Sequence, residues 1–283
     1  MKCLFAIVCI SLCLVGCQQN QSSSSEQTVT SYSADLSKKM AISQTQENLI
    51  SKYRKFVETT ENIDEYDQKG HTYLISAIEE NNIPAVKIIL AKKPDVNKPS
   101  KDGITPLMAV IQNGNKSIPK VLRNGAITFI EPKGTVNELL LQQLIESGAD
   151  VNMSNHEGLT ALMVAASFGN KDAVSFLLDH NADFNKKDMN GISALGYAVA
   201  NDHSEIVNAL AKAGADVDVI DNQGQSPLMY AAENGFLETA KLLIQKGANV
   251  NIRDQYDVTP LQLAKLQEHL DVAKLISRNG GKD

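Results

Sequence analysis

Apolar and polar positions alternate in blocks along residues 155–283, and the blocks repeat with a period of 33 residues. Each period holds an alanine-rich apolar run, a short polar break and a second apolar run, which predicts two short helices. The periods open at Asn155, Asp188, Asp221 and Asp254. A fixed period of this length is typical of a stacked solenoid, in which each unit buries its apolar face only against its neighbours.

Polar residues and glycines recur at the same positions of each period. These positions are where helix ends and tight turns are expected. Gly158, Gly191 and Gly224 lie where a turn needs positive φ. The hydroxyl residues expected to cap the first helix are Thr160, Ser193, Ser226 and Thr259. The residues expected to end the second helix in a left-handed conformation are Gly214, Gly247 and, in one period, Asn181.

These phrases resemble the ankyrin-repeat signature, for example Asp221-Asn-Gln-Gly-Gln-Ser-Pro-Leu228 followed by Gly247-Ala-Asn-Val-Asn251. The same register opens earlier at Asp67 and Ser100, which gives about six repeats over residues 63–283. The resemblance implies an all-α ankyrin-repeat solenoid, built of helix-turn-helix units joined by β-hairpin fingers. Lys93-Pro94 replaces the usual Gly-Ala, so this junction of repeat one departs from the pattern.

Repeat two is longer than the others and predicts an insertion. The interval from Ser100 to Asn155 is 55 residues instead of 33, which leaves 22 extra residues at about Lys116–Asn137. A second interpretation makes Ile118–Ala126 a truncated helix, Ile127–Asn137 a loop and Glu138–Ser147 a replacement helix. Prolines and glycines within the insertion argue against one long helix.

Residues 1–16 are predicted to be a signal peptide rather than part of the fold. An apolar stretch follows Lys2 and is too short to span a bilayer. Leu14-Val15-Gly16-Cys17 resembles the lipobox of bacterial lipoproteins, which implies cleavage after Gly16 and lipid attachment to Cys17. The alternative is an ordinary secretory signal that contains a cysteine. Because Gln18 follows, the resemblance implies an outer-membrane lipoprotein facing the periplasm.

Two segments are expected between the lipid and the repeats. Residues 17–33 are rich in Ser and Gln and are expected to form a disordered tether. Residues 34–62 are expected to form an N-terminal helical cap, with Leu49, Ile50, Tyr53, Phe56 and Val57 on one face. A partner-binding helix is the alternative for this segment.

Charge and cysteine content narrow the possible partners. The chain has 27 Lys and Arg against 33 Asp and Glu, and removal of residues 1–16 takes away one lysine and no acid. The acidic surface gives no drive toward nucleic acid or anionic lipid, so membrane contact is expected through the lipid anchor only. All four cysteines lie within residues 1–17, which leaves no thiol for a disulfide, zinc or catalysis in the repeats.

Catalytic motifs are missing from the sequence, and no enzyme, metal or cofactor is predicted. There is no Gly-x-Ser-x-Gly elbow, phosphate-binding loop or His-Glu-x-x-His helix. The five histidines are scattered without a second ligand at metal spacing and are expected to be solvated: His71, His156, His180, His203 and His269.

The remaining hypothesis is protein binding through the concave surface that the resemblance implies. Carried across through the register, the candidate contact residues are His156, Glu157, Leu159, Phe168, Met189, Asn190, Ile192, Asn201, Ile220, Gln223, Gln225, Glu233 and Asn234. The apolar members, Leu159, Phe168, Met189, Ile192 and Ile220, are predicted to form one central hot spot. The alternative is that Leu159 and Ile192 pack against adjacent fingers.

The favoured function is a membrane-anchored scaffold that sequesters one protein partner. Family analogy suggests an immunity protein that neutralises a secreted antibacterial toxin, such as an effector phospholipase. A periplasmic scaffold or protective partner of an envelope enzyme is the alternative. The free protein is expected to be monomeric.

Overall fold

The computed structural model separates the chain into two units, Met1–Lys52 and Tyr53–Asp283. The described residues are 47–48, 50–114, 118–121, 127–130 and 138–283. The predicted signal peptide, Cys17, the tether and residues 34–46 therefore lie outside the described residues.

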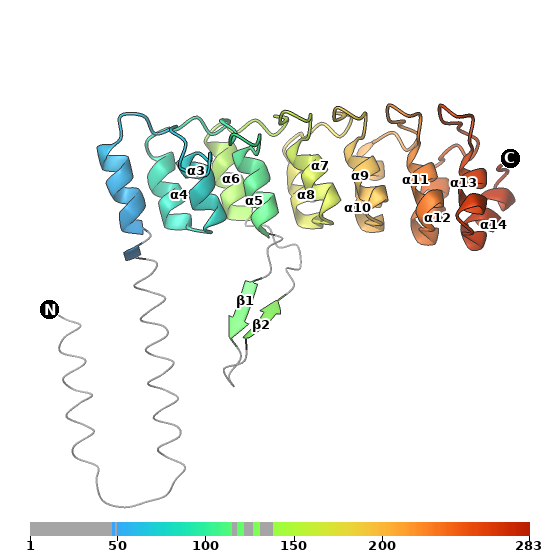
Figure 1. Cartoon of the computed structure of the whole chain (residues 1–283), viewed down its shortest axis with the longest axis horizontal. Helices are drawn as coiled ribbons and strands as arrows, with labels where there is room; N and C mark the ends of the chain where they lie inside the picture. The colour runs from blue at the N-terminus through green and yellow to red at the C-terminus, as the bar shows by residue number, and fades with distance from the viewer. Residues whose placement is uncertain (1–46, 49, 115–117, 122–126, 131–137) are drawn as a thin grey trace, which may run out of the picture. The chain divides into compact units, whose positions relative to one another are not determined.

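Pairs of antiparallel helices follow one another in chain order, as Figure 1 shows for α3 to α14. The first helices of the six repeats are α3 (Tyr73–Glu79), α5 (Pro106–Gly114), α7 (Ala161–Ser167), α9 (Ala194–Ala200), α11 (Pro227–Asn234) and α13 (Pro260–Leu266). The second helices are α4 (Ile83–Leu90), α6 (Glu138–Glu146), α8 (Lys171–Asp179), α10 (Ser204–Ala213), α12 (Leu237–Gln245) and α14 (Leu270–Arg278). The prediction of an all-α repeat solenoid is confirmed.

The predicted caps explain where the first helices begin. The side chains of Thr160, Ser193, Ser226 and Thr259 each accept a hydrogen bond from the backbone N–H three residues later. Pro227 and Pro260 occupy the first helical position, where a missing N–H costs nothing.

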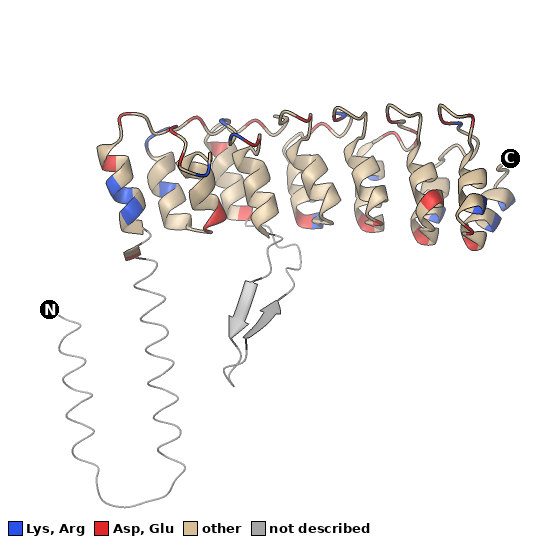
Figure 2. Ribbon diagram, in the orientation of Figure 1, with Lys and Arg blue, Asp and Glu red and all other residues tan. Residues whose placement is uncertain are grey.

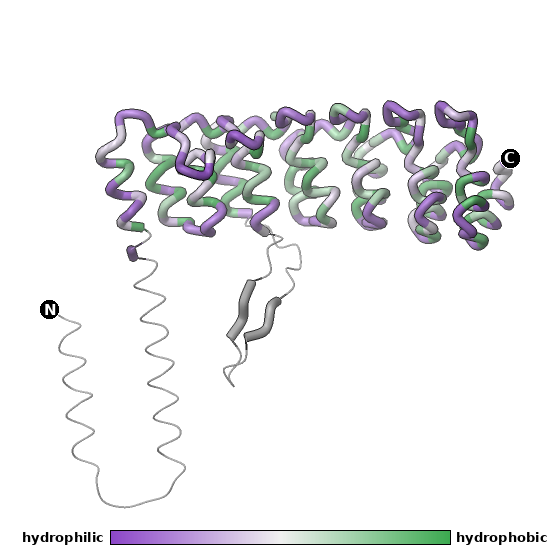
Figure 3. The backbone as a smooth tube through the Cα atoms, in the orientation of Figure 1, coloured by the Kyte–Doolittle hydropathy of each residue, from purple (hydrophilic) through white to green (hydrophobic). Residues whose placement is uncertain are grey.

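The core runs through the stack where neighbouring helix pairs meet. Leu195 and Leu228 are almost fully buried, and Ala231 and Ala232 are completely buried. Alanine lets the helices approach closely, and the apolar side chains pack both within each helix pair and between neighbouring repeats. Figure 3 shows the same division, with hydrophobic positions along the helices and hydrophilic positions along the connecting loops.

The fingers are short hairpins that bond to one another through their backbones. Isolated bridges such as Lys187↔Ser193 close individual fingers. The N–H of Met189 donates to the carbonyl of Glu157 (2.9 Å), and the N–H of Asn222 donates to that of Asn190 (2.9 Å). These bonds between repeats hold the inner edge of the stack in a fixed register.

Left-handed residues end most helices, and they include side chains that such a conformation disfavours. Gly214 caps α10 at φ 104°, and Asn181 follows α8 at φ 63°, as predicted. At the irregular junction of repeat one, Lys93 takes φ 55°. A lysine in this region carries strain of about 1–2 kcal/mol that glycine would avoid.

The insertion lies between α5 and α6 in sequence and contains an antiparallel strand pair. Strands β1 (Ile118–Val121) and β2 (Ile127–Ile130) pair with Ile118 opposite Ile130 and Val121 opposite Ile127. The interpretation of Ile118–Ala126 as a truncated helix is therefore wrong at Ile118–Val121, and that of Ile127–Asn137 as a loop is wrong at Ile127–Ile130, because both stretches are strands. The rest of each range lies outside the described residues. β-branched residues lie on both sides of Asn124-Gly125 in the sequence, a pattern that favours a hairpin over a helix. The helix expected over residues 138–147 is present as α6.

A helix over residues 50–59 packs against the first repeat through aromatic side chains. Tyr53 and Val57 are buried, and the Phe56 ring stacks on Tyr73 with 3.5 Å between ring centroids. The Tyr53 hydroxyl donates to a Glu80 carboxylate oxygen at 2.7 Å. Among the described residues, no helix combines the length and the apolar character needed to cross a bilayer.

Candidate protein-binding face

The first helices leave one side unburied in repeats four and five. In α9 and the residue after it, Tyr197 is half-buried and Ala200 and Asn201 are exposed, while the rest of the helix is buried. In α11, Tyr230, Glu233 and Asn234 occupy the same three positions one repeat later. These residues and the fingers beside them are called the inner face below.

Most of the predicted contact residues reach solvent, but four do so only in part. The exposed ones are His156, Glu157, Phe168, Met189, Asn190, Asn201, Ile220, Gln223 and Asn234. The half-buried ones are Leu159, Ile192, Gln225 and Glu233. Ile192 packs on its own repeat, because its Cγ2 lies 2.9 Å from the place that a Cβ on Gly196 would occupy. The structure thus offers fewer free apolar side chains than the sequence pattern predicts.

The apolar candidates form two spots instead of one. Met189 and Ile220 are 69% and 44% exposed and lie in adjoining fingers, where Lys187 Nζ donates to the Ile220 carbonyl (2.8 Å). Phe168 is 50% exposed but lies at the C-terminal end of α7. A seven-residue helix is about 10 Å long, so finger residues and helix-end residues cannot form one compact cluster.

Between the two spots lies a side-chain arrangement that sequence reasoning missed. The Tyr197 hydroxyl donates to Asp188 Oδ2 (2.8 Å), and the Tyr230 hydroxyl donates to Asp221 Oδ2 (2.6 Å). Each aspartate also accepts hydrogen bonds from backbone N–H groups of its own finger, such as that of Ile192 for Asp188 (2.7 Å). The signal available in the sequence was the nine-residue spacing from aspartate to hydroxyl residue.

The tyrosine–aspartate pairs change how the phenols titrate. Burial raises the pKa of Tyr197 well above its usual range, and the hydrogen bond to ionised Asp188 and the charge of that carboxylate raise it further. The same causes, with Asp221 as the acceptor, raise the pKa of Tyr230. Both rings are therefore neutral and fixed in orientation throughout the physiological range.

Repeat one uses a serine in the same position. The Ser76 hydroxyl donates to Asp67 Oδ2, and the backbone N–H groups of Lys69 and His71 donate to Oδ1. Burial works to raise the pKa of the Asp67 carboxyl, but these hydrogen bonds outweigh it and lower that pKa below its usual value.

The expectation of five solvated histidines is wrong for all but His156, because His71, His180, His203 and His269 are half-buried. His203 and His269 lie between repeats. Nε2 of His203 lies 3.0 Å from the Ser167 carbonyl, and a Cβ on Gly169 would lie 2.7 Å from the His203 ring. His269 makes the same 3.0 Å contact with the Glu233 carbonyl. The imidazoles of His203 and His269 occupy the space that a side chain on Gly169 or Gly235 of the preceding repeat would need.

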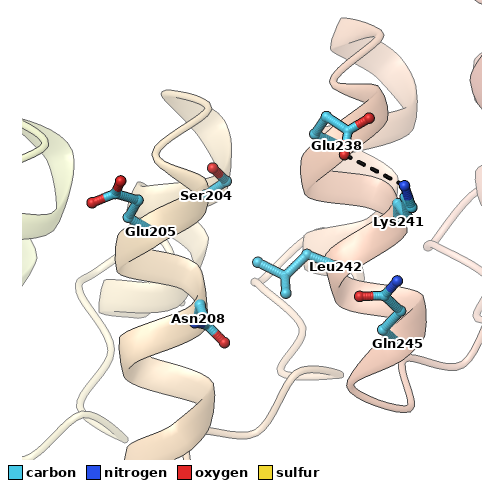
Figure 4. A pocket seen from close by; sticks show the side chains of 7 residues that line it. All are labelled: Ser204, Glu205, Asn208, Glu238, Lys241, Leu242 and Gln245. Carbon is cyan, nitrogen blue, oxygen red and sulfur yellow. Dashed lines mark ion pairs between the residues drawn. The ribbon is translucent and has the colours of Figure 1, made fainter.

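The open hollows involve the second helices, and one of them adjoins the predicted contact residues Phe168 and Asn201 through Gly169 and Asp202. The one in Figure 4 has a volume of about 350 Å³ and lies between α10 and α12. Glu238 pairs with Lys241 across one side of it (3.7 Å), and Ser204, Asn208 and Leu242 add to its lining. Figure 2 shows acidic residues in the first turns of the second helices. Within the described residues, no three histidine, cysteine or carboxylate side chains gather as metal ligands do.

Stacked helix pairs, fingers bonded in register and one unburied inner face define a repeat scaffold for binding proteins. The family profile described as ankyrin repeats (3 copies) matches residues 39–131, 133–221 and 213–283. The chain belongs to the ankyrin-repeat family.

Similar proteins cover a wide range of organisms. An ankyrin repeat protein of Fowlpox virus is 32% identical over 44% of this chain and 18% of its own length. An ankyrin repeat protein of Rickettsia felis is 32% identical over 40% of this chain and 44% of its own length. The transient receptor potential cation channel subfamily A member 1 of Homo sapiens is 30% identical over 40% of this chain and 11% of its own length. The matched part covers less than half of each relative.

Proposed function

We propose that the protein is a lipid-anchored, non-catalytic scaffold of the bacterial envelope that binds one protein partner at its inner face and neutralises it. The partner would be a secreted antibacterial toxin, such as an effector phospholipase, and the protein would act as its immunity protein. The observation that carries the binding role is the exposure of Met189, Ile220 and Phe168 on a face whose backbone is bonded in register. Exposed apolar side chains with polar neighbours are how interface cores are built.

A rigid face suits tight sequestration for an energetic reason. Backbone bonds such as that from Met189 to Glu157 order the fingers before a partner arrives. Binding then costs little additional conformational entropy, so more of the interaction free energy appears as affinity. A protein that must neutralise a toxin at low concentration needs that affinity.

The envelope location is proposed from the sequence around Leu14-Val15-Gly16-Cys17. Substitution of Cys17 by serine removes the sulfur that would carry the lipid, so we expect the variant to leave the membrane fraction. Membrane fractionation of cells, with a check that the signal peptide has been removed, measures this. Continued membrane association of a processed Cys17→Ser protein would show that another segment anchors it.

The binding role is tested by recovering the partner with the full lipidated chain and identifying it by mass spectrometry. The double variant Phe168→Ala, Met189→Ala should lower the affinity for that partner by about 2 kcal/mol or more, roughly 30-fold in Kd. Leu139→Ala is the matched control, because Leu139 is 52% exposed but lies on a second helix, α6.

The identity of the partner separates two roles for the same binding face. A toxin whose activity falls in the presence of the wild-type protein but not of the double variant would support neutralisation. A resident envelope enzyme as the partner would instead support the scaffold role. Equal affinity of the double variant and the wild type would place the interface elsewhere.

A further inference from the structure

We infer that the β1–β2 hairpin is a second membrane contact, which lies with one face against the anionic bilayer surface that holds the lipid anchor. The inference rests on the proposed function, because the anchor brings the hairpin to the bilayer, and it adds an orientation to that function. It follows from the face pattern of the hairpin, the charge of the insertion and the place where the hairpin joins the repeats.

The pairing register gives the hairpin one wholly apolar face. Successive residues of a strand alternate between the two faces of a sheet, so every second pair of the register shares a face. Two such pairs contain only apolar residues: Pro119 with Phe129 and Val121 with Ile127. The other face has Lys120 paired with Thr128, beside the pair of Ile118 and Ile130. The hairpin is therefore amphipathic, with a cationic residue on its less apolar face.

A hairpin of this size needs a surface that supports it. Each strand has four residues, and the sheet has two strands within the described part of the chain. An isolated pair of strands is at best marginally stable in water, and packing of its apolar face stabilises it. The headgroup region of a bilayer offers acyl chains to that face and water to the strand edges. Open sheet edges are excluded from the hydrocarbon core, so the hairpin lies at the interface and does not span the bilayer.

The insertion is basic in an otherwise acidic protein. Residues 116–137 contain four Lys and Arg and one acidic residue, whereas the whole chain has 27 Lys and Arg against 33 Asp and Glu. Each basic residue near an anionic leaflet strengthens binding by about fivefold. The net charge of the chain, from which contact through the lipid anchor only is expected, hides this local excess. The charge of the insertion thus complements an anionic lipid such as phosphatidylglycerol.

The hairpin joins the repeats at the end of the stack where each first helix turns into its second helix, called the turn edge below. In repeat two the insertion replaces this turn, because it follows Gly114 at the end of α5 and precedes Glu138 at the start of α6. The fingers lie at the other ends of the first helices, as the bridge from Ser154 to the α7 cap Thr160 shows. The hairpin and the fingers therefore belong to opposite edges of the stack.

The chain that leads from Cys17 enters the repeats at the turn edge. The Tyr53 hydroxyl donates to a Glu80 carboxylate oxygen (2.7 Å), and Glu80 caps the end of α3 at that edge. An anchored tether raises the local concentration of lipid around the hairpin, so a weak contact is sufficient. The hairpin alone does not hold the protein, because stable anchoring takes two signals, and the release expected of Cys17→Ser still stands.

The helix stack itself is not drawn to anionic lipid. Five second helices have an acidic residue in the first turn, at the turn edge (Figure 2): Glu138, Asp172, Glu205, Glu238 and Asp271. Three of these carboxylates pair with exposed lysines, as Glu205 does with Lys171 (2.9 Å). Contact with the bilayer is accordingly confined to the hairpin, and the fingers face away from the lipid.

The test places a dye on the hairpin of the full lipidated chain. All four cysteines lie within residues 1–17, and lipidation occupies Cys17 of the mature protein, so an introduced cysteine supplies its one free thiol. Val121→Cys, labelled with a nitrobenzoxadiazole dye, is reconstituted into vesicles of phosphatidylcholine and phosphatidylglycerol in equal parts. We expect blue-shifted emission, and quenching by a nitroxide lipid at least twice as strong as in vesicles of phosphatidylcholine alone.

Thr128→Cys with the same dye is the matched control, because Thr128 lies on the opposite face of the same hairpin. Tyr256→Cys reports on the finger edge, where Tyr256 is 75% exposed. Both labels should be quenched no more on anionic than on neutral vesicles. Lys120→Glu, added to the Val121 label, should lower the ratio of docked to free hairpin about tenfold or more, because an attraction becomes a repulsion. Circular dichroism melts establish that every variant is folded.

Three results would overturn the inference. The first is a Val121 label that is quenched no more than the Tyr256 label on anionic vesicles. The second is equal quenching of the Val121 and Thr128 labels, which would mean that no oriented face meets the lipid. The third is a Val121 label that the natural partner protects and lipid does not, which would assign the hairpin to the partner interface.

These three results leave the proposed function standing, because anchoring is measured by fractionation of Cys17→Ser and partner binding by the Phe168 and Met189 changes. Wild-type protein in the soluble fraction would instead refute the lipid anchor and this inference together.

Discussion

Repeats five and six share one 33-residue frame but differ at the places where the backbone is left-handed. The finger turn has Gly224 at φ 80° in repeat five and Asp257 at φ 63° in repeat six. The end of the first helix has Gly235 at φ 73° in repeat five and Glu268 at φ 61° in repeat six. The same conformation is thus reached with glycine in one repeat and with carboxylate side chains in the next.

The neighbours of these residues explain the difference. A Cβ on Gly224 would lie 3.1 Å from the Cα of Asp254, and one on Gly235 would lie 2.6 Å from the His269 ring. Both contacts belong to the following repeat, and no described element packs on the far side of repeat six. The comparison teaches that Gly224 and Gly235 make room for atoms of the next repeat, in addition to easing a left-handed backbone. Asp202 takes the helix-end position in repeat four at φ 56°, where Phe236 and not a histidine follows in the next repeat, so the need for glycine there depends on that neighbour.

The largest loss of stability should come from a side chain placed at Gly224, in the space that the backbone of repeat six leaves beside repeat five. Gly224→Ala adds a methyl group against the Asp254 backbone and forces alanine into a left-handed conformation, so we expect a loss of about 2–3 kcal/mol in the free energy of unfolding. Urea denaturation followed by circular dichroism measures it. A loss below about 0.5 kcal/mol would mean that the repeats can separate without cost and that the comparison is misleading.

A second difference is the tyrosine–aspartate pair, which repeat six lacks because Leu263 stands where Tyr230 stands in repeat five. Tyr230→Phe makes repeat five resemble repeat six and removes the hydrogen bond to Asp221, at an expected cost of about 1–2 kcal/mol. Denaturant titrations of the variant and the wild type at neutral pH test this. Equal stabilities would show that the phenol orients its ring without strengthening the fold.

The stability that Tyr230→Phe loses is expected to become smaller as the pH rises above about 10. The folded pKa of Tyr230 is raised by burial and by Asp221, so the bond contributes fully below about pH 10, the pKa of an unfolded tyrosine. The contribution is lost as the pH rises from there through the folded pKa. The stability difference between wild type and Tyr230→Phe should therefore be constant from pH 7 to 9 and shrink in more alkaline solution.

The smallest effect should come from giving repeat six the glycine of repeat five. Asp257→Gly relieves the left-handed strain but loses the ion pair with Arg253 (3.1 Å), which is exposed and contributes little. We expect a gain of up to about 1 kcal/mol in the free energy of unfolding, reduced by the greater freedom of glycine in the unfolded chain. A clear loss on thermal denaturation would show that the aspartate side chain is needed at this turn.

Local signals in the sequence were sufficient to predict the repeats. Caps such as Ser226, first-turn prolines such as Pro227 and left-handed residues such as Asn181 act within a few residues of themselves. Their positions therefore give the helix boundaries directly. The family register also identified Met189 and Phe168, both of which are exposed.

Contacts that join distant residues could not be predicted in the same way. His203 meets Gly169 and Ser167 across a repeat boundary, and neither residue alone signals a neighbour more than thirty positions away. One hot spot was predicted, but the exposed apolar residues form two separate spots. The repeat register predicts which residues face outward but not the distances between them. The β1–β2 pair was missed because a resemblance to a helix ending outweighed the turn pattern of Asn124-Gly125.

Main-chain bonds join neighbouring fingers, as from Met189 to Glu157 and from Gln255 to Gln223, in addition to side-chain bonds such as that from Lys187 Nζ to the Ile220 carbonyl. The exposed fingertip side chain of Met189 takes no part in the main-chain bond that its own residue makes. Substitutions there can alter what the surface recognises while the register of the stack stays as it is. Sequence changes at the fingertips can therefore alter which partner is bound while the fold is kept. A binding protein built in this way can adapt to a target whose surface changes.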